Sequence, residues 1–399
     1  MTGPVDERRL VEGREETLRK CYRVLEAYGK VYGAERFAEC KSCHWVTSCG
    51  LRFVKSMFMV LEELASKDLK SRVPLTANPR PPQTSIPLVE KLVGRYLYSK
   101  QGRLESLLLR LGLIDPDAFT CTPYYIGNKP SYGDILAWAE SSAVIYANSV
   151  LGARTNRNSS IVELLSGVTG ETPLFGLLLD ENRKADWLVE VKTSSKPSPF
   201  ILGSLIGKSV LDGVPYIAGL DRWEFEEYEL KDMGAAMAVW GAVGLFHAED
   251  LTPEAVENGR KILRSDHKVL RVGDEELSKM KREMEAKAAP GKPDLAIIGC
   301  PHLSREQLDF FARELSEAEL KTRTLLLAAP KIAREFKSTK LYSKLRDAGG
   351  DVDSFCPLML TNIPTSKRLK ILTNSGKLSY YSHAAFMDTP QLLSYLRGE

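Results

Sequence analysis

The feature that most constrains the fold is an alternation of short apolar runs with helical segments in the second half of the chain. Between residues 173 and 247 the apolar runs are short and are broken by Gly and Pro. Further along, "DLAIIGC" has the pattern of a buried strand, "PHLSREQLDFFARELSE" that of a turn and helix, and "TRTLLLAAP" that of the next strand. This alternation indicates an α/β architecture.

The first half of the chain is predicted to be mainly helical. Apolar residues recur at helical spacing over 13–38 and 51–66, and a second helical block spans 86–113. A proline-rich loop, "SRVPLTANPRPPQTSIP", follows a short strand. A highly charged helix at 275–292 ends in Ala-Pro-Gly and has the composition of a connection between lobes. It divides the chain into two predicted domains, 1–285 and 286–399.

Composition and charge exclude several classes of protein. A formal net charge of +3 gives no electrostatic footprint for nucleic acid. The longest apolar stretch, "PFILGSLIGKSVLDGVPYIAGL", is interrupted by Lys208, Asp212 and Pro215, which suits buried strands better than a membrane span. The charged amino terminus has no signal-peptide pattern. We therefore expect a cytoplasmic protein without nucleic-acid or membrane partners.

The stretch "CKSCHWVTSC" gathers Cys40, Cys43, His44 and Cys49 into ten positions. Its spacing is that of a c-type haem attachment, and the same residue types could hold zinc or an iron–sulfur cluster. Haem attachment and stable disulfides both belong to compartments outside the cytoplasm. In a reducing cytoplasm such cysteines are inert, catalytic or metal-bound, and the spacing alone does not decide among these.

The segment "GDILAWAESSAVIYANSVLGARTNR" combines burial with polarity. It predicts a helix from about Asp134 to Leu151 that is apolar nearly all round and hence buried. Buried polar groups cost about 1–3 kcal/mol each unless they are paired. The helix nevertheless carries four of them, namely Glu140, Ser141, Ser142 and Asn148.

The stretch "ARTNRN", which contains two cations and two amides, follows the glycine that ends this helix. Arg154, Thr155, Asn156 and Arg157 continue its polar line, and guanidinium groups bind carboxylate or phosphate in bidentate fashion. One interpretation is a socket for an anion. The other is that the polar groups cross-link neighbouring elements and the basic turn is solvated. The residue types alone do not decide between the two.

Three further cysteines lie beside predicted element ends. Cys121 lies in the loop before the polar helix, Cys300 ends a buried strand, and Cys356 precedes another polar loop. Ligands of open α/β sheets gather beyond the carboxyl ends of strands, so these thiols could bind three irons of a cluster. They could equally be buried free cysteines. His247 and His302 are interpreted as ordinary loop histidines.

Four stretches resemble, in order, the motifs of one enzyme family. They are "TPYYIGNKPSYGDILAWAESSAVIYANSVLGARTNRNSS", "GLFHAEDLTPEA", "AIIGCPHLSREQL" and "LTNSGKLSYYSHAAF". They are similar to the aconitase X family in its large-subunit form, and the resemblance covers roughly residues 15–390. It implies an aconitase-like, multi-lobe α/β/α architecture that lacks the swivel domain. In such proteins a small, β-rich subunit supplies that domain and carries the serine thought to act as catalytic base.

The resemblance also implies a cofactor and a set of site residues. An iron–sulfur cluster, expected to be 4Fe–4S with one open iron, would be held by Cys121, Cys300 and Cys356. The expected catalytic residues are Glu140, as proton donor or as the partner of an arginine, together with Ser141 and His44. The expected substrate-binding residues are Asn78, Ser142, Asn148, Arg154, Thr155, Asn156, Arg157, Asn374, Ser375 and Lys377. Cys40, Cys43 and Cys49 lie outside the family pattern and are interpreted as packing residues.

The implied activity is that of a hydro-lyase. Water would be removed from a small phosphorylated hydroxy acid, (R)-5-phosphomevalonate, to give trans-anhydromevalonate 5-phosphate in the archaeal mevalonate route to isoprenoids. One alternative is dehydration of cis-3-hydroxy-L-proline or another small hydroxy acid. An alternative of another class is a non-catalytic scaffold in which "CKSCHWVTSC" holds a structural metal.

Overall fold

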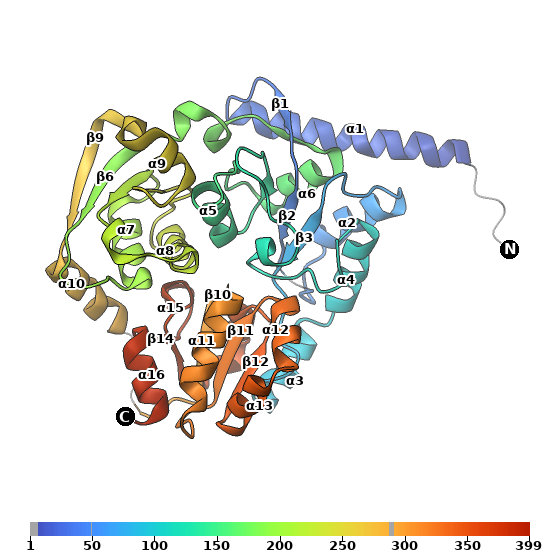
Figure 1. Ribbon diagram of the computed structural model, residues 1–399. Helices are drawn as coiled ribbons and strands as arrows, with labels where there is room; N and C mark the ends of the chain where they lie inside the picture. The colour runs from blue at the N-terminus through green and yellow to red at the C-terminus, as the bar shows by residue number, and fades with distance from the viewer. Residues whose placement is uncertain (1–6, 49, 287–290) are drawn as a thin grey trace.

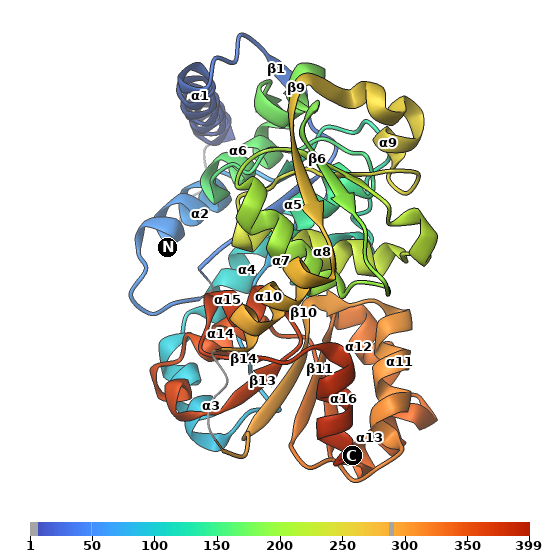
Figure 2. The same ribbon diagram turned by 90° about the vertical axis from the view of Figure 1, so that its left-hand side faces the viewer.

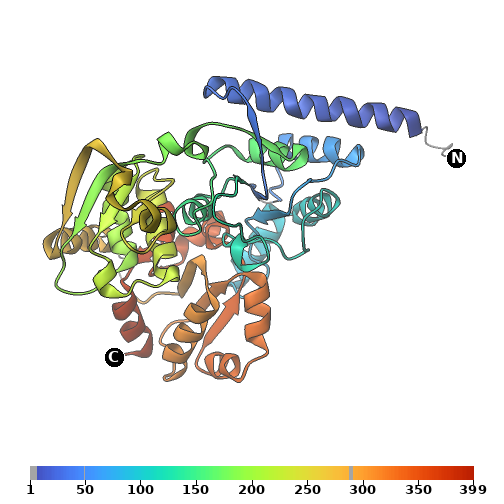
Figure 3. The ribbon, with the colours of Figure 1, turned by 45° about the horizontal axis from the view of Figure 1, so that its top comes forward.

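The computed structural model describes residues 7–48, 50–286 and 291–399. Three groups of elements surround a common centre, coloured blue to green, yellow-green and orange to red in Figure 1. The long helix α1 (Glu7–Val31) runs along one side and projects beyond the body of the molecule (Figure 3). Among the described helices, none combines the length and the hydropathy that a membrane span requires.

The N-terminal group contains two small sheets. Parallel strands have the order β3-β2-β4, and β1 pairs antiparallel with β5. The elements after α1 are β1 (Phe37–Glu39), β2 (Cys43–Val46), α2 (Ser56–Ser66), β3 (Leu75–Asn78), α3 (Leu88–Leu97), α4 (Gln101–Arg110), β4 (Ala137–Trp138), α5 (Ser141–Ser149), α6 (Ser160–Thr169) and β5 (Glu171–Pro173).

The middle group is built on a parallel sheet of order β8-β7-β6-β9. Its elements are β6 (Ala185–Val191), α7 (Pro199–Val210), β7 (Pro215–Ala218), α8 (Glu227–Trp240), β8 (His247–Ala248), α9 (Pro253–Asn258), β9 (Leu263–Val272) and α10 (Asp274–Glu285). The apolar side chains of α7 and α8 pack with those of β6 and β7 in one buried core.

The C-terminal group has a five-stranded parallel sheet of order β12-β11-β10-β13-β14. Its elements are β10 (Leu295–Leu303), α11 (Arg305–Ser316), β11 (Thr324–Ala328), α12 (Pro330–Lys337), α13 (Lys340–Asp347), β12 (Gly350–Asp353), α14 (Pro357–Thr361), β13 (Ile371–Thr373), α15 (Gly376–Tyr381), β14 (Ala385–Phe386) and α16 (Thr389–Arg397). The connections therefore alternate strand and helix, as the sequence predicts.

Alternate residues of β10 enter different cores. Ala296 and Ile298 pack with residues of α11 and α16, whereas Leu295 and Ile297 pack with residues of α14. Figure 2 shows α11 and α13 on one side of this sheet and α14 on the other. A strand that is covered on both faces explains the continuous apolar run "DLAIIGC".

Several predicted helices are shorter than expected. The helix expected over 13–38 ends at Val31, because Gly33 adopts a φ of +76° and residues 37–39 pair with β5. The block 86–113 is two helices separated at residues 98–100, and the helix expected over 51–66 begins only at Ser56. The charged helix ends at Glu285, and part of its predicted Ala-Pro-Gly end lies outside the described residues.

Helix α5 starts later than the sequence predicts. The predicted start is about Asp134, but Ala137 and Trp138 form strand β4, which pairs in parallel with Cys43 and His44 of β2. The helix begins at Ser141 because the carboxylate of Glu140 accepts the backbone N–H of Ala143 at 2.7 Å. Glu140 is therefore the N-cap of α5, and not a residue within the helix.

Close packing joins α15 of the C-terminal group to the middle group. A side chain at Gly376 would come within 3.0 Å of the Ser204 hydroxyl oxygen on α7. The indole N–H of Trp240 at the end of α8 donates to the Gly376 carbonyl at 3.3 Å. The first turn of α15 is consequently held in the centre of the molecule, where the three groups of elements meet.

Candidate active site

A buried ion pair between Glu140 and Lys377 lies at this centre. Glu140 comes from the start of α5 and Lys377 from the first turn of α15, and both are nearly inaccessible to solvent. The Lys377 ammonium donates to a carboxylate oxygen of Glu140 and to the hydroxyls of Ser142 at 3.1 Å and Ser141 at 3.3 Å. The other carboxylate oxygen of Glu140 accepts from Ser142 at 2.6 Å.

Both members of the pair are charged. Burial by itself raises the pKa of Glu140, but Lys377 and the hydrogen bonds from Ser142 and Ala143 lower that pKa further, to below its usual value. Burial also lowers the pKa of Lys377, but the charges of Glu140, Cys300 and Cys121 more than offset this and hold it above its usual value. Glu140 is thus a carboxylate whose partner is a lysine. The ion-pair partner of Glu140 is therefore a lysine and not the arginine considered from the sequence, and its catalytic role stays a prediction.

Three free cysteines surround this ion pair. Cys121 and Cys300 are buried and Cys356 is partly buried. Burial raises the pKa of each of the three thiols to about 12, and each thiol lies within electrostatic range of the other two and of Lys377. The structure thus brings together thiols from three distant parts of the sequence.

The three thiols do not form a compact site for a single metal ion. Within the described ranges, no group of three His, Cys, Asp or Glu side chains could hold one metal ion. In an iron–sulfur cluster each cysteine binds a different iron, so that the ligand sulfurs need not converge on one point. Three buried thiols without disulfide partners, next to a lysine that favours the thiolate form, fit such a group.

Buried polar atoms without partners adjoin the ion pair. His44 contacts Thr76 through Nδ1 at 2.9 Å, but its Nε2 is buried and makes no hydrogen bond in the described part of the chain. Burial lowers the pKa of His44 to about 4, although the charge of Glu140 raises it in part, so the ring is neutral. Asn374 donates to Thr389 at 3.0 Å, while its side-chain oxygen is likewise buried and unpaired. Such atoms are costly unless a ligand satisfies them.

Asn78 and Ser375 differ in whether their side chains have hydrogen-bond partners. Asn78 ends β3 and is buried, and its side-chain amide makes no hydrogen bond within the described residues. Ser375 is used by the protein, since its hydroxyl donates to the Cys300 carbonyl and accepts the Leu378 N–H at 3.0 Å as the N-cap of α15. It therefore ties the cysteine strand to the helix that carries Lys377.

Three residues expected to orient substrate have structural partners instead. The Asn148 amide donates to the carbonyls of Thr155 at 2.9 Å and Gly244 at 2.8 Å, and its oxygen accepts from the Thr155 N–H and from Arg183. Asn156 donates to the Phe175 carbonyl at 3.0 Å and accepts from the Leu177 N–H at 2.8 Å. With every polar atom engaged, Asn148, Thr155 and Asn156 cross-link neighbouring segments.

The two arginines of this turn lie in different surroundings. Arg154 pairs with Asp180 at 2.5 Å, donates to the Leu178 carbonyl and lines a surface pocket with Glu257 and Lys261. Arg157 donates to the Ala242 carbonyl and lies within electrostatic range of Glu140 and Tyr381. Arg157, whose side chain is exposed, is thus within electrostatic range of the ion pair, whereas Arg154 is paired with Asp180.

The local cysteine motif is a packing element. The thiol of Cys40 donates to the Ser166 carbonyl at 3.5 Å, and that of Cys43 donates to the Glu163 carbonyl at 3.2 Å. Both thiols are fully buried against α6. Cys49 lies outside the described residues.

Two residues that the sequence did not single out belong to the site. The Tyr124 hydroxyl is buried and unpaired in the described part of the chain, and it lies within electrostatic range of Cys121 and Glu140. His302, interpreted from the sequence as an ordinary loop residue, is buried beside the same thiols. Each lies within three residues of a cysteine in the sequence, and that proximity is the signal that could have found them.

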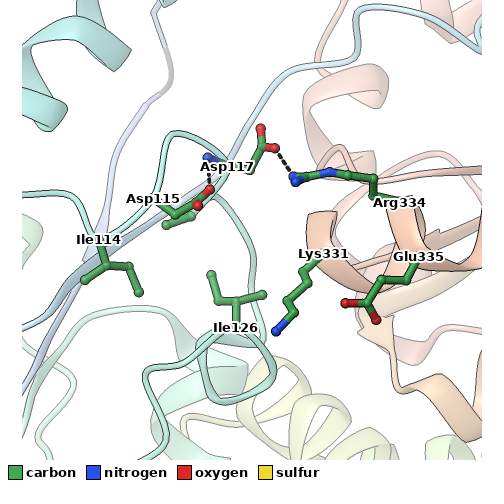
Figure 4. Close-up of a pocket in the computed structure, with 8 residues that line it drawn as sticks. Ile114, Asp115, Asp117, Ile126, Lys331, Arg334 and Glu335 are labelled. Atoms are coloured by element: carbon green, nitrogen blue, oxygen red, sulfur yellow. Dashed lines mark hydrogen bonds and ion pairs between the residues drawn. The ribbon is translucent and has the colours of Figure 1, made fainter.

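A separate cavity of about 460 Å³ does not coincide with the site. It lies between the loop at 114–118 and α12, and Figure 4 shows Asp117 paired with Arg334 across it. None of the residues expected from the sequence to form the site lines this cavity. The buried charges and unpaired polar atoms locate the candidate site better than open volume does.

Comparison with known families gives a consistent result along the whole chain. The models described as aconitase X first, second and third domain match residues 4–181, 185–282 and 293–395. The chain belongs to the aconitase X family. Its structure is similar to the holo-form of aconitase X from Thermococcus kodakaraensis, with a TM-score of 0.83, 28% sequence identity and 99% of each chain covered. The aconitase-like α/β fold expected from the sequence is confirmed.

Three relatives bear on the kind of reaction. The chain is 31% identical to the phosphomevalonate dehydratase large subunit of Methanocaldococcus jannaschii, covering 97% of this chain and 98% of that protein. It is 32% identical to the large subunit of the same name from Thermococcus kodakarensis, covering 91% and 90%. It is 30% identical to cis-3-hydroxy-L-proline dehydratase of Pseudomonas aeruginosa, covering 92% of this chain but 64% of that protein.

Replacing Glu140 with Gln tests the ion pair. The substitution leaves the buried Lys377 without its counter-charge, so we expect the free energy of unfolding to fall by about 3–5 kcal/mol near neutral pH. Because the pKa of Glu140 is lowered in the folded state, its contribution is present above about pH 4.5 and is lost as the pH falls through the folded-state pKa. Urea unfolding as a function of pH measures the difference between the two proteins.

The control for this prediction is Lys30→Ala, which breaks an exposed pair between Lys30 and Glu26 on α1. Water and salt screen an exposed pair, so this variant should unfold almost as the wild type does. Equal effects of the two substitutions, or a Glu140→Gln effect that does not diminish at acid pH, would show that the pair is not the buried interaction described here.

Proposed function

We propose that this chain is the large subunit of a dehydratase that converts (R)-5-phosphomevalonate to trans-anhydromevalonate 5-phosphate and water. The proposal rests on how much of each relative the chain matches. It matches 98% and 90% of two phosphomevalonate dehydratase large subunits, but only 64% of the bacterial cis-3-hydroxy-L-proline dehydratase. The relatives are named dehydratases, and a dehydratase is a hydro-lyase. The cytoplasmic location and the division into domains 1–285 and 286–399 stay predictions.

Cys121, Cys300 and Cys356 would hold the iron–sulfur cluster. Their burial, their mutual electrostatic range and the absence of competing disulfides support this assignment, as does the adjacent Lys377. When bound, the cluster would supply a Lewis-acidic iron, in a 4Fe–4S cluster the one without a cysteine, for the departing hydroxyl group. The protein's own task is to hold the substrate against that metal.

Cationic and neutral donors beside the thiols would bind the substrate. Lys377 and Arg157 both lie within electrostatic range of Glu140, and they carry the positive charge that a carboxylate or phosphate requires. Ser141 and Ser142 supply hydroxyls at Lys377, which suits them to orient the hydroxy acid. Asn78, Asn374 and His44 contribute buried polar groups that lack partners among the described residues.

The carboxylate of Glu140 would keep Lys377 charged and positioned. An ionised Glu140 is suited to stabilise cations and not to deliver a proton. The proton next to the substrate carboxylate would pass to a serine on a small swivel-domain subunit, and the large-subunit names of the relatives support the existence of such a partner.

A turnover assay tests the reaction and its substrate. The chain is co-expressed without oxygen with the small-subunit homologue of its own organism, and the purified complex receives (R)-5-phosphomevalonate or cis-3-hydroxy-L-proline. We expect dehydration of the phosphorylated substrate, measured by formation of the unsaturated acid. Turnover of hydroxyproline alone would establish the alternative dehydratase, and turnover of neither substrate by a complex that contains zinc but no iron would favour the scaffold.

Replacing Cys300 with Ser tests the cluster ligands. The variant should lose the visible charge-transfer absorbance and the bound iron and sulfide, because a serine hydroxyl is a much poorer ligand for iron. Cys40→Ser is the matched control, since Cys40 is also a free, fully buried cysteine but donates to a helix carbonyl. Loss of iron in both variants or in neither would contradict the ligand assignment.

Neighbouring arginines allow a test of anion binding. Arg157→Ala removes a cation beside the ion pair, so kcat/KM should fall about tenfold or more, as expected for a lost charged hydrogen bond. Arg154→Ala removes a cation that is paired with Asp180 elsewhere, and its kcat/KM should stay within about twofold. A larger loss of kcat/KM in Arg154→Ala than in Arg157→Ala would show that Arg154, and not Arg157, binds the substrate.

A further inference from the structure

We propose that His302 is a positioning residue that clamps the three cysteine-bearing segments into one arrangement. The inference rests on the proposed function only in taking Cys121, Cys300 and Cys356 as cluster ligands. These segments come from the loop before α5, from β10 and from the start of α14, and the chain itself does not hold them close to one another. Hydrogen bonds from one residue of β10 reach the other two segments.

The backbone and the ring of His302 bind different cysteine segments. Its backbone N–H donates to the Cys121 sulfur at 3.3 Å, across 181 residues of sequence. Its ring Nε2 contacts the carbonyl of Phe355, the residue before Cys356, at 3.2 Å. Cys300 is two residues before His302 on the same strand. One buried side chain and its own peptide therefore link all three segments.

The partners determine which ring nitrogen carries the proton. A carbonyl oxygen only accepts, so Nε2 must donate to Phe355. In the neutral ring Nδ1 then accepts from the Thr120 hydroxyl at 2.8 Å. That hydroxyl oxygen in turn accepts the Thr122 N–H at 3.1 Å. The ring thus binds Thr120 directly and Thr122 through the Thr120 hydroxyl, and these two residues flank Cys121.

The clamp is anchored to the middle group of elements. Lys231, on α8, is fully buried and donates to the His302 carbonyl at 2.9 Å and to the Gln307 side-chain oxygen at 2.7 Å. Asp232 lies 3.3 Å from the same ammonium and accepts from Gln307 at 2.8 Å. The backbone of His302 is thereby tied to α8 through its carbonyl and to Cys121 through its N–H.

A clamp has a physical purpose at this position. The Cys121 and Cys356 segments are distant in sequence from β10, so only tertiary contacts keep their thiols beside Cys300. Hydrogen bonds within a buried network oppose separation of the segments, whether or not a metal is bound.

Thiol labelling of the metal-free protein tests the clamp without reference to activity. Iodoacetamide modification is followed cysteine by cysteine with peptide mass spectrometry. In His302→Ala the backbone N–H that donates to Cys121 remains, but the ring's bonds to Thr120 and to the Phe355 carbonyl are lost. We therefore expect Cys121 and Cys356 to react about tenfold faster than in wild type. His302→Gln, which offers an N–H near the position of Nε2, should return Cys356 towards the wild-type rate.

His247 supplies the matched control. It is equally buried, and its Nε2 contacts the Arg183 carbonyl at 2.8 Å, but it is not bonded to any of the three cysteine segments. His247→Ala should leave the labelling of Cys121 and Cys356 within about twofold of wild type. A comparable increase in this variant, or none in His302→Ala, would overturn the proposal. Thr120→Val, which removes only the Nδ1 partner, serves if His302→Ala does not fold, and it should accelerate Cys121 alone.

The loaded protein gives a second measurement. Under a fixed concentration of chelator, the visible absorbance of His302→Ala should decay at least about tenfold faster than that of wild type or His247→Ala. Equal decay of all three would overturn the proposal. A wild-type protein that never acquires iron would instead refute the proposed function, and the labelling experiment would still decide whether His302 holds the segments together.

Discussion

The buried ion pair of Glu140 and Lys377 is the interaction on which the candidate site depends. It joins the beginning of α5 to the beginning of α15, and these belong to groups of elements with separate hydrophobic cores. Removing two charges from water is costly, and here the cost is offset by mutual attraction and by bonds from Ser141, Ser142 and the Ala143 amide. The pair can form only when both helices are in place.

The same pair sets the electrostatics around the three cysteines. Lys377 lowers the pKa of Cys121, Cys300 and Cys356, which favours the thiolate form that binds metal, while burial and Glu140 act in the opposite direction. Thiols that stay protonated without metal and ionise upon binding it form a site in which metal affinity depends on pH.

Hydrogen-bond saturation separates residues that build the site from residues that face a ligand. Asn148 and Asn156 use their donors and acceptors on backbone groups, and so they hold the turn that presents Arg157. His44 and Asn374 each leave one buried atom unsatisfied among the described residues. From the sequence all four are equivalent buried polar residues, because residue type alone does not tell which partners the fold provides.

The sequence by itself determined the elements whose signals are local. Alternating strand and helix patterns and the family motifs around the cysteines correspond to the observed α/β fold. Prediction from the sequence was wrong where distant contacts override local helix propensity. Ala137 and Trp138 pair with β2, although the pattern of their segment predicts a helix. Only the tertiary structure decided that Glu140 meets Lys377, 237 residues away, and that His302 joins three cysteine segments. Such partnerships depend on how separate groups of elements pack together, and no periodicity along one segment records that.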